Sequence, residues 1–115
     1  MKVLSLSAHQ FRNLNFPAPI LIPEEPLIAI LAPNASGKTN FLEALVMLLR
    51  GKSFRARNTE CVEWGKDNFV VQGSVDYGQG ETSLFVQYDM PRKATRITED
   101  NAPVSPVTFF GHYPL

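Results

Sequence analysis

The residues best suited to chemistry form one continuous stretch, residues 32–39, with the sequence Ala-Pro-Asn-Ala-Ser-Gly-Lys-Thr. A small residue, four others and then Gly-Lys-Thr is the spacing of a phosphate-binding loop. In such a loop, backbone N–H groups from Ala35 to Thr39 point at a β-phosphate, and the following helix directs its positive N-terminus at the same anion. The pattern predicts that Gly37 lets the backbone approach, Lys38 reaches the β- and γ-phosphates, and the Thr39 hydroxyl binds Mg²⁺.

The same residues have a plainer interpretation, a Gly-Lys-Thr turn in front of an ordinary helix. A chance match is expected in roughly one chain of this length in a hundred, given average residue frequencies. Two positions depart from the usual pattern: Ala32 opens the motif, and Ala35 stands where related loops commonly have Gly. A methyl group costs conformational freedom wherever the backbone needs a positive φ. We therefore expect an intact loop with reduced nucleotide affinity, and a noncatalytic nucleotide-binding module stays open as an alternative.

The neighbouring elements are those that a phosphate loop needs. Residues 27–32 form an apolar run without alternation, which is typical of a strand covered on both faces. From Gly37 onward the apolar residues follow a helical period and leave only a thin polar stripe, at Asn40, Glu43 and Arg50. Gly51 stands where a helix C-terminal cap is expected. The sequence thus predicts a buried strand, a loop and a largely buried helix in the order that the motif requires.

The rest of the chain predicts antiparallel strands. Alternating or apolar segments indicate strands at residues 1–11, 14–22, 69–77, 84–88 and 93–99. Pro17 and Pro19 restrict the second of these to an edge or an irregular path, and a turn is expected at residues 23–26. Residues 52–67 are expected to form a loop. The fold class is therefore α+β, with a mixed or antiparallel sheet around the helix that follows the phosphate loop.

Length and composition limit the class of protein. With 115 residues and 12.8 kDa the chain is about one small domain, and 44% hydrophobic with 19% charged residues indicates a globular chain. Lys+Arg 11 and Asp+Glu 11 cancel, which argues against nucleic-acid binding through bulk positive charge. The single cysteine excludes a disulfide framework and a Cys-rich zinc site. With no signal peptide and no apolar run of membrane length, we expect a soluble cytoplasmic protein without membrane contact.

Positive charge is concentrated after the predicted helix. Residues 50–57, the basic segment, carry four cations, Arg50, Lys52, Arg55 and Arg57. Lys and Arg neutralise phosphates regardless of nucleic-acid sequence, so this segment is a candidate contact to the DNA backbone. A solvated helix end explains the same charges equally well.

Four other residues have plain structural interpretations. His9 and His112 have no partners at metal-ligand spacing and are expected at the surface or in packing. Cys61 is expected to be a small, partly buried hydrophobe. Trp64 is expected in the core or in packing between lobes.

Together these motifs resemble the RecF family of bacterial recombination mediators, whose head is an ABC-type ATPase related to SMC proteins. The resemblance covers nearly the whole chain: the Met-Lys-x-Leu start, Phe-Arg-Asn at residues 11–13, residues 32–44, and Gly-Lys-Ser-Phe-Arg at residues 51–55. The last segment, with Trp64-Gly65, distinguishes the RecF family from other SMC-like heads.

The resemblance implies a set of site residues with ATP and Mg²⁺ as cofactors. The implied nucleotide contacts are Arg12, Ala32, Pro33, Asn34, Ala35, Ser36, Gly37, Lys38, Thr39 and Asn40. Lys38 is the implied catalytic residue and Thr39 the implied metal ligand. A guanidinium such as that of Arg12 offers planar, charge-assisted bonds to phosphate oxygens, although a surface residue after a strand is the alternative. Asn13 is interpreted first as a turn residue.

The resemblance also implies an incomplete ATPase. No Walker B Asp-Glu and no signature motif occurs in the sequence, so residues 1–115 are expected to be one N-terminal lobe of an ABC-type P-loop ATPase head. The isolated chain is expected to bind nucleotide weakly and to hydrolyse none above background, and the full-length parent to be a weak DNA-dependent ATPase.

The implied function is ATP-dependent DNA binding in replication, recombination and repair of damaged DNA, assisting recombinase loading at gaps. The implied partners are gapped or single/double-strand junction DNA, recombination mediator proteins, and a second copy in an ATP-dependent homodimer. The alternatives are a head fragment of another SMC-like ATPase, a degenerate noncatalytic nucleotide-binding module, and a P-loop kinase. A kinase is disfavoured because the alternation after Trp64 indicates antiparallel hairpins.

Overall fold

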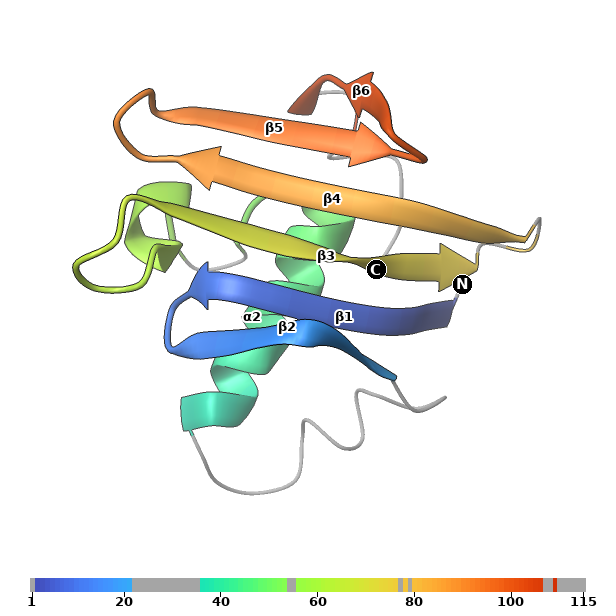
Figure 1. Ribbon diagram of the computed structural model, residues 1–115, viewed down its shortest axis with the longest axis horizontal. Coiled ribbons are helices and arrows are strands. Elements are labelled where there is room, and N and C mark those ends of the chain that lie inside the picture. The colour runs from blue at the N-terminus through green and yellow to red at the C-terminus, as the bar shows by residue number, and fades with distance from the viewer. Residues whose placement is uncertain are drawn as a thin grey trace.

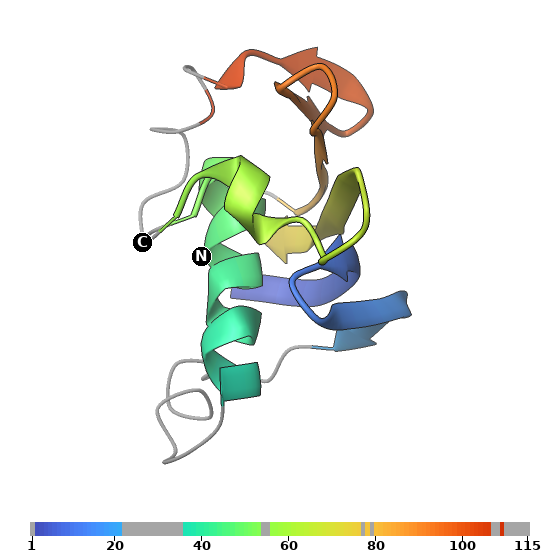
Figure 2. The same ribbon diagram turned by 90° about the vertical axis from the view of Figure 1, so that its left-hand side faces the viewer.

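One antiparallel sheet and one long helix are the main elements of the part of the chain that the computed structural model describes, which is residues 2–21, 36–53, 56–76, 78, 80–106 and 109. The six strands lie in the order β2-β1-β3-β4-β5-β6. The helix, α2, crosses one face of this sheet (Figures 1 and 2). The elements are β1 (Lys2–Phe11), β2 (Leu14–Leu21), α2 (Ser36–Arg50), β3 (Asn68–Asp76), β4 (Glu81–Asp89), β5 (Ala94–Glu99) and β6 (Ala102–Val104).

The two N-terminal strands lie where the sequence predicts them. β2 is at the edge of the sheet that the described residues form, which suits its two prolines because proline has no backbone N–H to donate to a ladder. Its pairing with β1 is irregular, with register shifts between Leu6 and Ala8 and between Ala8 and Phe11. The strand expected at residues 27–32 and the turn expected at residues 23–26 lie outside the described residues.

The C-terminal half forms the predicted meander and one further strand. β3 pairs with β4 and β4 with β5, both antiparallel and without register shifts. β6 was not predicted, because it has only three residues and includes Pro103. The signal for it lies in the two-residue loop before it, Asp100-Asn101, where both residues adopt the positive φ (51° and 69°) that a tight hairpin needs.

The loop expected over residues 52–67 contains regular structure. A 3₁₀ helix spans Asn58–Cys61, and Val62 forms an isolated bridge with Phe11. Two further backbone hydrogen bonds fix this segment to the end of β1: Arg12 N donates to Cys61 O at 2.7 Å and Glu63 N to Gln10 O at 2.8 Å. These partners are about fifty residues apart in sequence, so no local pattern indicates the pairing.

The helix ends as its sequence predicts. Gly51 has a φ of +76°, and its N–H donates to Met47 O at 2.8 Å, which closes the last turn. A Cβ at this position would lie 2.7 Å from Ile97 Cδ1, so β5 also packs closely against the cap. Glycine therefore serves both the backbone conformation and the contact with the sheet.

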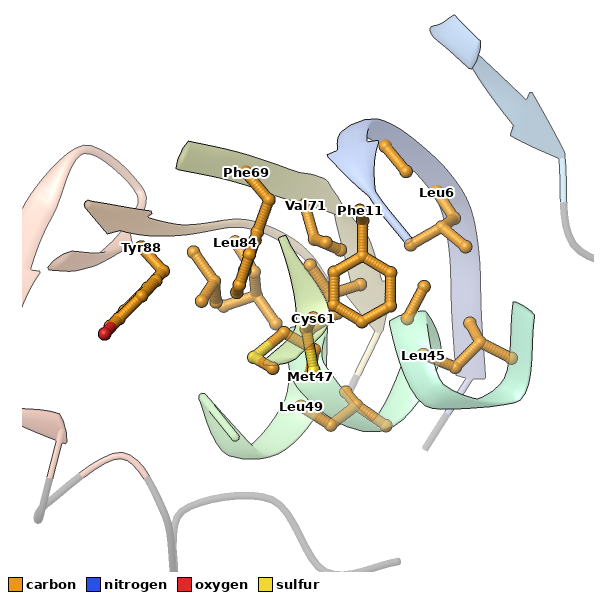
Figure 3. Packing of buried hydrophobic residues seen from close by; sticks show 14 of the residues in the cluster. Leu6, Phe11, Leu45, Met47, Leu49, Cys61, Phe69, Val71, Leu84 and Tyr88 are labelled. Carbon is orange, nitrogen blue, oxygen red and sulfur yellow. The ribbon is translucent and has the colours of Figure 1, made fainter. Parts of the chain in front are cut away.

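The core lies between α2 and the sheet (Figure 3). Phe69 is at its centre, edge-on to Phe11 at 5.0 Å and stacked on Tyr88 at 5.8 Å between ring centroids. Gly73 on β3 allows the closest approach, since a Cβ there would lie 2.1 Å from the carbonyl oxygen of Ser5 and 3.1 Å from Leu48 Cδ2.

Two residues differ from their expected environments. Trp64 is 97% exposed, so the expectation that it belongs to the core is wrong for this chain. Its backbone lies in an exposed turn, closed by Lys66 N donating to Glu63 O, where none of the described elements covers it. Glu43, expected on a polar stripe, is completely buried. Cys61, expected to be a partly buried hydrophobe, is completely buried, and His9 is at the surface, one of the two positions expected for it. His112 lies outside the described residues.

Candidate functional site

The phosphate-loop motif runs into the first turn of α2. Because α2 begins at Ser36, the Gly-Lys-Thr of the motif stands within its first turn. The first N–H groups of a helix have no partner within it and carry its partial positive charge, so they can bind an anion. Within the described residues the structure thus provides the helix start that the motif requires; the remaining motif residues, Ala32, Pro33, Asn34 and Ala35, lie outside them.

Arg12 stands beside this helix and is bound to it by an ion pair. Its Nε donates to Glu43 Oε1 at 2.8 Å, and its Nη2 donates to Glu43 Oε2 at 3.1 Å. This hydrogen bonding raises the pKa of Arg12, whose side chain is 27% exposed. Arg12 also has a positive φ of 53°, at the tight turn between β1 and β2. The two interpretations of Arg12 from the sequence were a phosphate contact, implied by the resemblance, and a surface residue after a strand; the structure shows a bidentate pair with Glu43.

A second contact fastens the same turn to α2. Asn40 Nδ2 donates to Asn13 Oδ1 at 2.9 Å, and Asn40 precedes Glu43 by three residues, so both lie on one face of the helix. Asn13 is thus a turn residue, as expected, and also a partner of α2. The turn between β1 and β2 is therefore held next to the N-terminal half of α2.

Glu43 connects Arg12 to two residues that follow α2 in the chain. Ser53 Oγ donates to Glu43 Oε2 at 2.5 Å, and Cys61 Sγ lies 3.6 Å from the same oxygen. Ser53 Oγ also accepts from the backbone N–H of Ala56 at 3.2 Å. We call Arg12, Glu43, Ser53 and Cys61 the Glu43 cluster. Sequence reasoning missed it; its only local signal is an acidic residue among the apolar residues of α2.

The cluster keeps its cysteine protonated. Burial, and then the negative charge of Glu43, raise the pKa of Cys61 to about 12. A thiol with such a pKa is neither a nucleophile nor a metal ligand at neutral pH, because both roles require the thiolate. The structural interpretation of Cys61 is therefore confirmed.

The basic segment is only partly exposed. Lys52 and Arg57 are exposed and Arg50 is half-buried, whereas Arg55 lies outside the described residues. Asn58, directly after the segment, donates from Nδ2 to Gly51 O at 3.2 Å and to Thr95 Oγ1 at 3.0 Å. These bonds hold the segment against the C-terminal end of α2 and the start of β5.

Comparison with known proteins decides which family this arrangement represents. The family model described as an AAA domain matches residues 4–104. The chain belongs to the AAA domain family. It is also homologous to RecF: it is 35% identical over 117 aligned residues to the DNA replication and repair protein RecF of Chlamydia trachomatis serovar L2, an alignment that covers 100% of this chain and 31% of that protein.

Solved structures show the same fold. This AAA-family chain matches a structure of the recombination mediator protein RecF-ATPrS in the RecFOR pathway with a TM-score of 0.73 and 25% identity. The match covers 96% of this chain and 30% of that one. It matches the SMC head domain from Thermotoga maritima with a TM-score of 0.65 and 14% identity, over 94% of this chain and 40% of that one. The chain thus spans about a third of the length of its RecF relatives, and the N-terminal lobe of a RecF- or SMC-type head is its fold.

The described part of this AAA-family chain has neither a metal-binding cluster nor a membrane-spanning helix. No three residues among its His, Cys, Asp and Glu gather in a way that could hold a metal ion. None of its helices has the length and apolar character needed to cross a membrane.

Proposed function

We propose that this chain is the ATP-binding lobe of a RecF-like DNA recombination and repair ATPase. The observation that carries the proposal is the homology to RecF along the whole chain, together with a helix whose first turn contains the Gly-Lys-Thr of the motif. The RecF structure with the same fold is named as a complex with ATPrS. An SMC-like head outside the RecF family has support from the fold alone, at 14% identity.

The residue types of the motif suit a magnesium nucleotide. The proposed phosphate contacts are the backbone N–H groups at the start of α2 and the Lys38 ammonium, with Ala32, Pro33, Asn34, Ala35, Ser36 and Asn40 around them. Mg²⁺ prefers oxygen ligands and usually keeps several waters, so one hydroxyl, that of Thr39, is a sufficient contribution from this lobe. When bound, Mg²⁺ neutralises charge on the β- and γ-phosphates.

The proposed role of this lobe is to bind and orient the nucleotide. The helix start and Lys38 place positive charge where negative charge increases during phosphoryl transfer, and Arg12 is proposed to add a guanidinium from the turn between β1 and β2. Positioning a water for attack requires a further group. We therefore propose that the whole ATPase hydrolyses ATP and that the 115-residue chain alone does not.

The partners proposed for the whole protein are DNA, recombination mediator proteins and a second copy of the same protein, in the cytoplasm. On this chain the proposed DNA contacts are the cations of the basic segment, Arg50, Lys52, Arg55 and Arg57. Lys52 and Arg57 suit this role because they are exposed, and cations on a surface bind the DNA backbone without sequence preference. For DNA binding, the local positive charge of the basic segment then matters more than the neutral net charge of the whole chain.

Isothermal titration of the chain with MgATP tests the proposal. We expect saturable binding that Lys38→Ala weakens by about tenfold or more, because a charge-assisted contact to phosphate contributes about 1.5–3 kcal/mol. Lys66→Ala is the matched control, since it removes an exposed lysine from the turn after Trp64. Equal affinities of the wild type and Lys38→Ala, or no binding by the wild type, would contradict the proposal.

A further inference from the structure

One buried carboxylate joins two parts of the chain to which separate roles are proposed. On one side Glu43 holds Arg12, the proposed phosphate contact, with both of its oxygens. On the other side its Oε2 accepts from Ser53, which lies within the basic segment, the proposed DNA contact. Glu43 itself is completely buried, so no solvent can replace these partners.

The Arg12 side of this connection lies beside the N-terminal half of α2. Helical side chains lean toward the N-terminus, so the Glu43 carboxylate lies over the turn that contains Asn40. Asn40 is bonded to Asn13, next to Arg12, which confirms that this turn of the chain lies along the same stretch of helix. The Arg12 guanidinium uses Nε and Nη2 for Glu43, and Nη1 takes no part in that pair.

The Ser53 side of the connection reaches the backbone N–H of Ala56, which also lies in the basic segment. The Ser53 hydroxyl donates its proton to Glu43, which leaves its oxygen oriented to accept the backbone N–H of Ala56. A neutral partner in place of the carboxylate would weaken this bond, because hydrogen bonds to charged groups are the stronger ones. The hydrogen bond from the Ala56 N–H to Ser53 therefore depends on the charge and the position of Glu43.

We propose that Glu43 is a positioning residue that couples the nucleotide site to the basic segment. Separating Arg12 from Glu43 would take two charge-assisted hydrogen bonds from a completely buried carboxylate, which is strongly unfavourable. The pair therefore stays together when Arg12 turns Nη1 toward a phosphate, and Glu43 moves with it. Because the same carboxylate oxygen holds Ser53, that movement changes the hydrogen bond from Ala56. This inference rests on the proposed function, since it requires a nucleotide at the start of α2.

Two-dimensional ¹H–¹⁵N NMR of the 115-residue chain with saturating MgATP tests the coupling. The amide signals of Gly37 and Lys38 report nucleotide binding, and the amide signal of Ala56 reports the basic segment. In the wild type we expect all three to shift. In Ser53→Ala, which keeps the Arg12–Glu43 pair, we expect MgATP affinity to stay within twofold of the wild type while the nucleotide-induced shift of Ala56 is lost.

Two further variants separate coupling from mere support of the fold. Arg12→Ala and Glu43→Gln should each weaken MgATP binding and each abolish the shift of Ala56 at saturation, whereas Glu81→Gln, which removes an exposed carboxylate at the start of β4, should change neither. If these residues only support the fold, every variant that folds should show the same nucleotide-induced shift of the Ala56 amide as the wild type, once the nucleotide site is saturated.

The outcomes distinguish this inference from the function on which it rests. If the wild type shows no shift at Gly37 and Lys38, the proposed nucleotide site is absent, and the coupling is refuted with it. If those amides shift but that of Ala56 does not, or if Ser53→Ala keeps the Ala56 shift, the nucleotide site stands and the coupling through Glu43 is refuted.

Discussion

At the scale of single residues, burial decides chemistry that the sequence alone leaves open. The helical period predicts Glu43 on a polar stripe, and the structure buries it against Arg12, which is 31 positions away in sequence. Both residue types were visible in the sequence, but their pairing depends on a turn between two strands that packs on a helix. The same is true of Trp64, whose size suggests packing and whose turn leaves it 97% exposed.

Cys61 gives a residue-scale prediction that does not depend on the proposed function. An unfolded thiol ionises near pH 8.5–9, whereas the folded thiol stays protonated until pH about 12. Between these values the folded state binds more protons than the unfolded state, so the free energy of unfolding falls as the pH rises, by at most about 1.4 kcal/mol per pH unit. Below the lower value Cys61 contributes no pH dependence.

Urea denaturation of the wild type and of Cys61→Ala between pH 7 and pH 11 measures this contribution. The difference between the two free energies of unfolding should be constant up to about pH 8.5. Above that pH the wild type should lose stability steadily relative to Cys61→Ala. A thiol-reactive disulfide reagent at pH 8 should modify the folded wild type far more slowly than the urea-unfolded chain. Equal rates would show that Cys61 is accessible and ionisable in the folded state.

At the scale of elements, local chemistry predicted most of what the structure contains. The helical period of the apolar residues and the Gly51 cap predict α2 and its end. The alternation of apolar and polar residues between turns predicts β3, β4 and β5. Local chemistry failed where an element is held by distant partners. The 3₁₀ helix at Asn58–Cys61 is fixed by the end of β1, and β6 is a three-residue strand that depends on its pairing with β5.

The close pairing of β1 with β3 gives an element-scale prediction at Gly73. Gly73→Ala should destabilise the chain by about 1–3 kcal/mol, because the new Cβ would meet the Ser5 carbonyl and force the strands or α2 to shift. Gln72→Ala, at an exposed position of the same strand, is the control and should stay within about 0.5 kcal/mol of the wild type. Urea midpoints measure both. A Gly73→Ala variant as stable as the control would mean that the register Leu6↔Gly73 is not the one in solution.

At the scale of the whole molecule, the strand order decides how the candidate site is assembled. Neighbouring strands in sequence pair as hairpins, but β1 lies between β2 and β3, and β3 begins more than fifty residues after β1 ends. That non-local pairing brings the turn carrying Arg12 and Asn13 to α2 and brings Cys61 next to Arg12. The sequence could predict the phosphate-loop motif, because its chemistry is contiguous. It could not predict the Glu43 cluster, because the members come together only through the sheet.

The central claim is that a nucleotide binds with its phosphates at the start of α2. A crystal structure of the chain grown with Mg²⁺ and a nonhydrolysable ATP analogue tests it most directly. We predict the β-phosphate within hydrogen-bond distance of the backbone N–H groups of Gly37, Lys38 and Thr39, with the Thr39 hydroxyl on Mg²⁺ and Arg12 Nη1 facing a phosphate while Nε remains on Glu43. An analogue bound elsewhere on the chain, or crystals that exclude it at saturating concentration, would contradict the account.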